Sequence, residues 1–112
     1  SQEHRYEEGY YDCSSLVQRL YQEVGISLPA IASTQGEFMV THGLEVTEGE
    51  LEPGDLIFYS YEQNGQFRNI SHVAIYVGNG RMVHAANSRR GVVNDPFNPS
   101  NIGLYGRPSR LQ

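Results

Sequence analysis

One cysteine and two histidines are the residues of this chain whose types and spacing could support covalent chemistry. Cys13 is the only cysteine among the 112 residues, and His72 and His84 lie 12 residues apart (84 − 72). A thiolate can attack a carbonyl carbon, and an imidazole beside it can accept and later return a proton. A second polar side chain on the far ring nitrogen would fix the tautomer of that imidazole. A Cys-His-His triad for acyl transfer is therefore the hypothesis to test.

The local sequence leaves two interpretations of Cys13 open. It stands at the expected start of a helix, where unpaired backbone N–H groups and the helix dipole favour the thiolate. It also lies three and four residues before Leu16 and Val17, so it shares the helix face that meets the sheet. A core thiol would point in the same direction, because free cysteine is among the most buried residue types. Only a base close to the sulfur distinguishes a nucleophile from a core residue.

The four histidines differ in their surroundings. His4 and His42 occur in polar stretches without a regular period, and we expect them at the surface. His72 and His84 lie in an expected β-hairpin, where the alternative to catalysis is a half-buried strand residue with satisfied hydrogen bonds. Catalytic zinc sites usually draw on closer ligand spacing than Cys13 and these two histidines offer, so we expect no metal.

The hairpin must meet a geometric condition if the two histidines act together. A two-residue turn would place His72 and His84 on opposite faces of the sheet, because side chains alternate along a strand. A three-residue loop at residues 78–80, with Gly80 left-handed, would place Ala74 opposite His84 and His72 diagonal to it. The triad requires both imidazoles on one face, turned toward the helix, so we predict the three-residue loop.

Apolar residues that recur every four positions predict a helix over Cys13–Val24. The members of the apolar stripe are Leu16, Val17, Leu20, Tyr21 and Val24. Asp12 is the expected N-cap and Gly25 the expected C-terminal stop. The stripe should pack on the sheet.

The remaining pattern predicts an α+β fold of the papain-like kind in a single domain, residues 1–112, with residues 1–11 as an extended lead-in. The expected elements are a short helix near Ser33–Val40, a buried strand at Asp55–Ser60, the hairpin strands Ser71–Val77 and Arg81–Ala86, a strand near Val92 and Val93, and an edge strand within residues 103–111. The acidic run Glu45–Asp55 is expected to be a solvated connection and residues 94–101 a loop.

Composition and charge exclude several classes of protein. No apolar run reaches membrane-spanning length, so we expect no membrane partner. Residues 1–62 carry twelve acids and two arginines, whereas residues 63–112 carry six arginines and one acid. The net charge of −5 lacks the basic footprint of nucleic-acid binding, so we expect no nucleic acid either. Arg89 and Arg90 are either solvated loop charges or contacts for a ligand carboxylate.

Four stretches together resemble the NlpC-type family of papain-like cell-wall cysteine peptidases, and the resemblance covers essentially the whole chain. In chain order they are DCSSLVQ at residues 12–18, LEPGDLIFY at 51–59, SHVAIYVGNGRMVHA at 71–85 and GRPSRL at 106–111. The spacing of the two histidines also matches the family. Ser15 stands where the family commonly has glycine, and Tyr6, Tyr10 and Tyr11 lie nearer to the cysteine than the upstream tyrosine of such domains.

The resemblance implies a papain-like fold in which Cys13 is the nucleophile, His72 the base and His84 the third, polar member. It implies that Asp12 and Ser14 help to hold the substrate and that no cofactor is needed. The implied reaction is hydrolysis of peptidoglycan stem peptides, usually between γ-D-glutamate and the following diamino acid, through a thioester. We accordingly expect a secreted or cell-wall-associated bacterial protein that is a monomer.

Two other functions remain possible at this point. The first is a CHAP-type amidase or endopeptidase, a neighbouring branch that carries an acidic residue or asparagine in place of His84. The second is a catalytically silent cell-wall-binding module. The presence of Cys13, His72 and His84 together argues against both.

Overall fold

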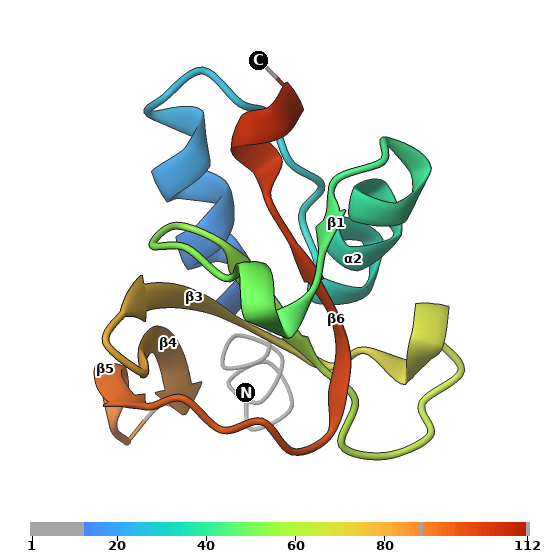
Figure 1. Ribbon diagram of the computed structural model, residues 1–112. Helices are drawn as coiled ribbons and strands as arrows, with labels where there is room; N and C mark the ends of the chain where they lie inside the picture. The colour runs from blue at the N-terminus through green and yellow to red at the C-terminus, as the bar shows by residue number, and fades with distance from the viewer. Residues whose placement is uncertain (1–12, 88, 112) are drawn as a thin grey trace.

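The computed structural model of the chain describes residues 13–87 and 89–111. Within this part of the chain, a helix over residues 13–22 and α2 (Ala32–Thr41) lie on one side of a six-stranded antiparallel sheet (Figure 1). The strand order is β1-β6-β2-β3-β4-β5. The strands are β1 (Glu45–Val46), β2 (Leu56–Tyr59), β3 (His72–Gly78), β4 (Arg81–Asn87), β5 (Gly91–Pro96) and β6 (Ile102–Gly106), with short 3₁₀ turns at Glu48–Glu50, Phe67–Asn69 and Pro108–Leu111. The α+β class is confirmed, and the expected lead-in lies outside the described residues.

Both faces of the sheet are covered, as the four consecutive buried residues of β2 show. Leu56 and Phe58 face the helices, whereas Ile57 and Tyr59 face the other way. We call the two sets of buried residues the helix-side cluster and the far-side cluster. The helix-side cluster contains Cys13, Val17, Ile26, Leu28, Ala32, Met39, Leu44, Leu56, Phe58, Ile70, Val73, Ile75, Ala85 and Leu104. The far-side cluster contains Val46, Ile57, Tyr59, Ala74, Met82 and Tyr105.

The first helix forms where expected but buries a different stripe. Cys13 and Val17 are 2% and 1% exposed, whereas Leu20 and Val24 are 43% and 58% exposed. The helix ends at residue 22, before Val24. The predicted stripe is therefore only partly right. Val17 is buried and Tyr21 packs against the helix-side cluster, but Leu20 and Val24 are exposed, because the buried face is centred on Val17, roughly 100° further round the helix than Leu16.

The acidic run at residues 45–55 is not merely a solvated connection. It contains β1, which pairs with the end of β6, so β6 lies inside the sheet and the expectation of an edge strand at residues 103–111 is wrong. The run ends in Asp55, which is 2% exposed. The Nε and Nη2 atoms of Arg107 donate to its two carboxylate oxygens at 2.8 and 2.9 Å. Arg107, just after β6, thus gives this buried carboxylate a charged, two-pronged hydrogen-bond partner.

The hairpin has a two-residue turn, so the predicted three-residue loop is wrong. Gly78 pairs with Arg81, and Asn79 and Gly80 both have positive φ angles, 54° and 69°, as a type I′ turn requires. The pairing then shifts, because Tyr76 lies opposite Met82.

Val77 is the extra residue of this β-bulge. Beyond the bulge Tyr76 faces Met82 and Ile75 faces Val83, which is the register that a three-residue loop would give to this part of the hairpin. The predicted register is therefore present, although a bulge and not a longer loop produces it.

The strand expected near Val92 and Val93 extends further than predicted. β5 runs over Gly91–Pro96 and pairs with β4, with Val93 opposite His84 and Asp95 opposite Met82. Part of the segment predicted to be a loop, residues 94–101, is therefore strand. This extension brings Asp95 onto the sheet face that carries His84.

Candidate functional site

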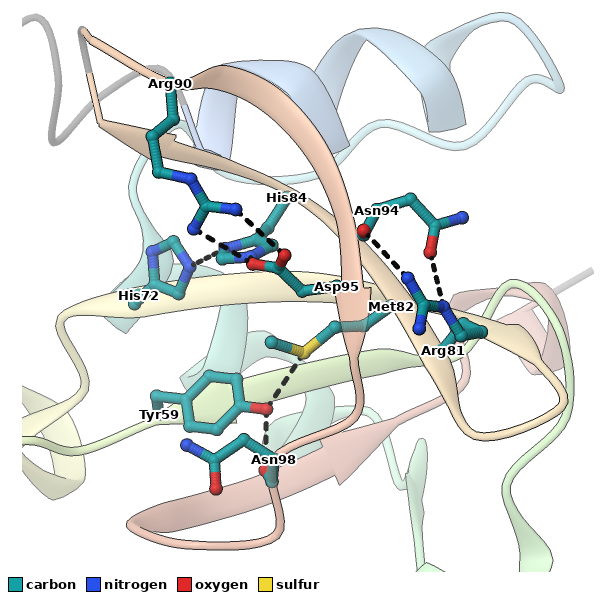
Figure 2. Close-up of polar contacts among 9 residues, drawn as sticks. All are labelled: Tyr59, His72, Arg81, Met82, His84, Arg90, Asn94, Asp95 and Asn98. Carbon is teal, nitrogen blue, oxygen red and sulfur yellow. Dashed lines mark hydrogen bonds and ion pairs between the residues drawn. The ribbon is translucent and has the colours of Figure 1, made fainter.

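The two histidines form a direct hydrogen bond. Nε2 of His72, the first residue of β3, lies 2.8 Å from Nδ1 of His84 on β4 (Figure 2). The ring centroids are 5.0 Å apart and the rings meet edge to face at 76°. The far ring nitrogen of His72 is thus bonded to a second polar side chain, as the triad hypothesis requires.

Two further residues continue this line of contacts, as Figure 2 shows. Nε2 of His84 lies 2.9 Å from Oδ2 of Asp95. Arg90 donates to both oxygens of the same carboxylate, from Nη1 to Oδ2 at 3.2 Å and from Nη2 to Oδ1 at 2.9 Å. These bonds lower the pKa of Asp95 to about 2; the bond from Arg90 has the larger effect and the bond from His84 the next largest. Asp95 therefore carries a negative charge throughout the neutral and mildly acidic range.

Sequence reasoning missed Asp95, although the chain carries a signal for it. It is the one acid among the six arginines of residues 63–112. Arg90, considered as a contact for a ligand carboxylate, instead binds the carboxylate of Asp95.

His72 occupies a site that disfavours its protonated form. Burial, followed by the charge of His84, lowers the pKa of His72 to about 4. The rings of Tyr59 and Tyr61 lie near the imidazole, with centroids 6.0 and 6.3 Å from it. The imidazole is therefore neutral at pH 7 and able to accept a proton.

Cys13 lies in the first described turn of its helix and is buried in the helix-side cluster with Val73 and Ala85. Tyr61 interacts electrostatically with Cys13 and also lies near His72. Burial and the charge of Cys13 raise the pKa of Tyr61, so its hydroxyl lies within electrostatic reach of the thiol. The ring of Tyr61, just after β2, also lies 6.3 Å from the imidazole of His72.

The histidine pair does not face the helices. Tyr59 pairs with His72 and Ile57 with Ala74, so His72 shares the sheet face of the far-side cluster. The expectation that both imidazoles lie on one face is met, but the expectation that this face is turned toward the helix is wrong. The alternation along β3 turns Val73 to the helices and His72 away from them.

The other candidate residues have different surroundings. Asp12 lies outside the described residues. Ser14 is completely buried, and its carbonyl oxygen accepts a hydrogen bond from the Gln35 amide at 3.0 Å. His42 caps the end of α2, where its Nδ1 lies 3.1 Å from the carbonyl oxygen of Phe38. It takes no part in the site.

Among the residues described, no group of three or more His, Cys, Asp or Glu side chains could hold a metal ion. Over the same part of the chain, no helix is long and apolar enough to cross a membrane.

A helix with a cysteine, packed on an antiparallel sheet that carries a histidine pair, defines a papain-like α+β domain. Comparison with known proteins identifies the family: the NlpC/P60 family profile matches residues 3–102, and the chain belongs to this family. A solved NlpC/P60 family protein from Bacillus cereus superposes with a TM-score of 0.72 at 30% identity, over 87% of this chain and 31% of that one.

Two of the curated relatives illustrate the functional names found in the family. The γ-D-glutamyl-L-lysine dipeptidyl-peptidase of Bacillus cereus is 33% identical over 89% of this chain and 28% of its own length. The bifunctional muramidase/DL-endopeptidase CwlT of Bacillus subtilis is 41% identical over 70% of this chain and 22% of its own length. The chain therefore spans less than a third of these relatives.

A third similar protein is named differently. RipD of Mycobacterium tuberculosis, named as a non-catalytic NlpC/p60 domain protein adapted to peptidoglycan binding, has a TM-score of 0.69 at 26% identity. The match covers 87% of this chain and 66% of that one. The fold is thus shared by relatives named as enzymes and by one named as non-catalytic.

Proposed function

We propose that this domain is a cysteine endopeptidase that hydrolyses peptidoglycan stem peptides between γ-D-glutamate and the following diamino acid. The observation that carries the proposal is the 2.8 Å bond between His72 and His84, beside a tyrosine that also interacts with Cys13. Family membership and the names of the peptidase relatives support the substrate class. The same names favour action at the bacterial cell wall, by a secreted or wall-associated protein.

In the proposed reaction the sulfur of Cys13 attacks the carbonyl carbon of the stem peptide, and its proton passes to His72. The oxyanion that forms accepts a hydrogen bond from the backbone N–H of Cys13. His72 then protonates the departing amine nitrogen, which leaves a thioester on Cys13. Water, deprotonated by His72, attacks the thioester and releases the acid product and the free thiol.

The environment of His72 suits this role. Its lowered pKa, about 4, keeps the imidazole in the proton-accepting form at neutral pH. His84 orients the ring through the bond to Nε2. We assign Asp12 and Ser14, which flank the nucleophile, to the stem peptide. For Ser14 this assignment depends on the family resemblance alone, since its side chain is completely buried.

One observation favours a second candidate, a cell-wall-binding module without activity. Cys13 is only 2% exposed, as a core thiol would be, and the similar RipD is named as non-catalytic. A CHAP-type amidase is less well supported, because the third position holds His84 and not an acid or asparagine.

The experiment incubates the purified chain with muropeptides and separates the products. We expect release of the dipeptide fragment by the wild type and none by Cys13→Ala. Sedimentation with insoluble peptidoglycan tests the alternative in parallel. Binding without dipeptide release, equal in both proteins, would establish the silent module, and equal release by both would refute the cysteine mechanism.

A further inference from the structure

We propose that Asp95, held by Arg90, is a positioning residue that fixes His84 in the tautomer able to accept a hydrogen bond from His72. This inference rests on the proposed function, because it assigns a fourth member to the same site. Asp95 touches neither the substrate nor the nucleophile in this scheme. It acts through His84 and then through His72.

The sheet brings Asp95 to His84 by its register. On β5, Val93 lies opposite His84 and Asp95 lies opposite Met82, so Asp95 is the diagonal neighbour of His84 on the same face. The carboxylate lies 2.9 Å from Nε2 of His84. The side chains of His84 and Asp95 are 10% and 24% exposed, so water competes weakly for this bond.

Arg90 leaves the carboxylate little freedom. Its two Nη atoms bind both oxygens of Asp95, at 3.2 and 2.9 Å, in the forked geometry that guanidinium and carboxylate groups share. Arg90 itself is half exposed, and its backbone N–H donates to the Asn87 side chain at 2.8 Å. Arg90 therefore orients Asp95 from the turn between β4 and β5.

The tautomers follow from the chemistry of an ionised carboxylate, which can only accept hydrogen bonds. Nε2 of His84 must therefore carry a hydrogen. In neutral His84 the Nδ1 atom then has a lone pair, and Nε2 of His72 must donate to it. The lone pair of neutral His72 is consequently on Nδ1, the nitrogen left to accept the thiol proton.

Without Asp95, nothing fixes which of the two histidines donates the hydrogen bond between them. His84 could then carry its hydrogen on Nδ1 and donate it to Nε2 of His72. His72 would in turn carry its hydrogen on Nδ1 and could not act as the base toward Cys13. The same carboxylate also stabilises the positive charge that His72 gains when it takes the thiol proton, while the proton itself stays on His72 until the amine leaves.

The test compares Asp95→Ala with Glu45→Gln, a matched control that removes another acid from an ion pair with an arginine. Glu45 binds Arg68 at 3.3 Å on the surface, away from the histidines. Two readouts are used: the ¹⁵N chemical shifts of the histidine rings, which report tautomers, and the kcat and KM of stem-peptide hydrolysis. Arg90→Gln serves as a second variant if Asp95→Ala unfolds, because it keeps the Asp95 carboxylate but removes the guanidinium that holds it.

We expect His84 to carry its hydrogen on Nε2 in the wild type and in Glu45→Gln, and to populate both tautomers in Asp95→Ala. We expect kcat to fall about 10- to 100-fold with KM little changed. Arg90→Gln should shift the same equilibrium to a smaller extent. An unchanged tautomer in both Asp95→Ala and Arg90→Gln would overturn the inference.

A second comparison, made in the His84→Asn variant, distinguishes a positioning role of Asp95 from a merely structural one. In His84→Asn the amide oxygen can accept from His72 without any tautomer to be fixed. Asp95→Ala should therefore lower kcat less there than in the wild-type background, because only the electrostatic stabilisation of protonated His72 is lost. An equal loss in both backgrounds would overturn the inference. If the wild type releases no dipeptide, the proposed function fails, but the tautomer measurement still decides the role of Asp95.

Discussion

Nε2 of His72 lies 2.8 Å from Nδ1 of His84, although a turn of only two residues connects their strands. On an unbroken ladder such a turn would place the two side chains on opposite faces of the sheet. The bulge at Val77 adds one residue to β3 and restores the pairing that the site needs. The contact between the histidines therefore depends on an irregularity of the strand.

Burial of His72 makes the stability of the domain depend on pH. Its pKa is about 4 in the folded protein and about 6.5 in an unfolded chain, so the unfolded state binds more protons between these values. The free energy of unfolding should therefore fall as the pH decreases from 6.5 to 4, by up to about 3 kcal/mol. Urea denaturation at pH 7, 5.5 and 4.5 measures this loss.

His72→Gln is the control for that titration, since it removes the group that takes up the proton. Its unfolding free energy should change much less over the same range. Asp95 stabilises the folded state above its unfolded pKa, and this stabilisation is lost only as the pH falls from about 4 toward 2, because folding lowers its pKa to about 2 from an ordinary value near 4. A wild-type loss as small as that of His72→Gln would contradict the assignment.

Local patterns predicted most of the elements. The hairpin strands, the buried strand ending at Tyr59 and the second helix all lie within a few residues of their predicted bounds. They share a clear period and turn signals such as Asn79-Gly80. The α+β class follows from their order along the chain.

The remaining features depend on contacts between distant parts of the chain. Nothing near residues 103–111 indicates that β6 lies inside the sheet, because its neighbour β1 is a two-residue strand in an acidic run. The bulge at Val77 and the placement of Asp95 beside His84 likewise depend on pairing between strands. The buried face of the first helix likewise depends on its packing against the sheet, which buries Val17 and leaves Leu20 at the surface.

The ion pair between Asp55 and Arg107 should be important for stability. Arg107→Ala would leave the buried carboxylate without its partner, and we expect a loss of about 3–5 kcal/mol in the free energy of unfolding. Arg110→Ala is the matched control, because Arg110 only approaches the exposed Glu50 at 3.9 Å. Its cost should stay below about 0.5 kcal/mol. Thermal or urea denaturation that gave both variants the same stability would contradict this prediction.

Gly106 is a site of close approach between β6 and α2. A Cβ atom there would lie 2.4 Å from Cγ of the fully buried Met39. Gly106→Ala should therefore destabilise the fold by about 1–3 kcal/mol through overpacking. Gly49→Ala, where a Cβ would meet no atom within 4 Å, should have little effect. Urea midpoints of the two variants test the difference, and a Gly106→Ala midpoint equal to that of Gly49→Ala would count against it.

Tyr61 should limit the access of water to the imidazole of His72. Its ring stacks on Tyr59 at 5.4 Å and lies 6.3 Å from the imidazole of His72, and the residue is 50% exposed. Since burial is the main cause of the lowered pKa of His72, Tyr61→Ala should raise that pKa from about 4 toward its ordinary value.

Tyr61→Phe provides the control, because it keeps the ring and removes only the hydroxyl. NMR titration of His72 should give a pKa close to that of the wild type in Tyr61→Phe and a higher one in Tyr61→Ala. The acid limb of the pH profile for stem-peptide hydrolysis should move upward with it, since His72 must be neutral to accept the thiol proton. If both variants titrate alike, the tyrosine ring does not keep water from His72, and the low pKa must come from Tyr59 and the charge of His84.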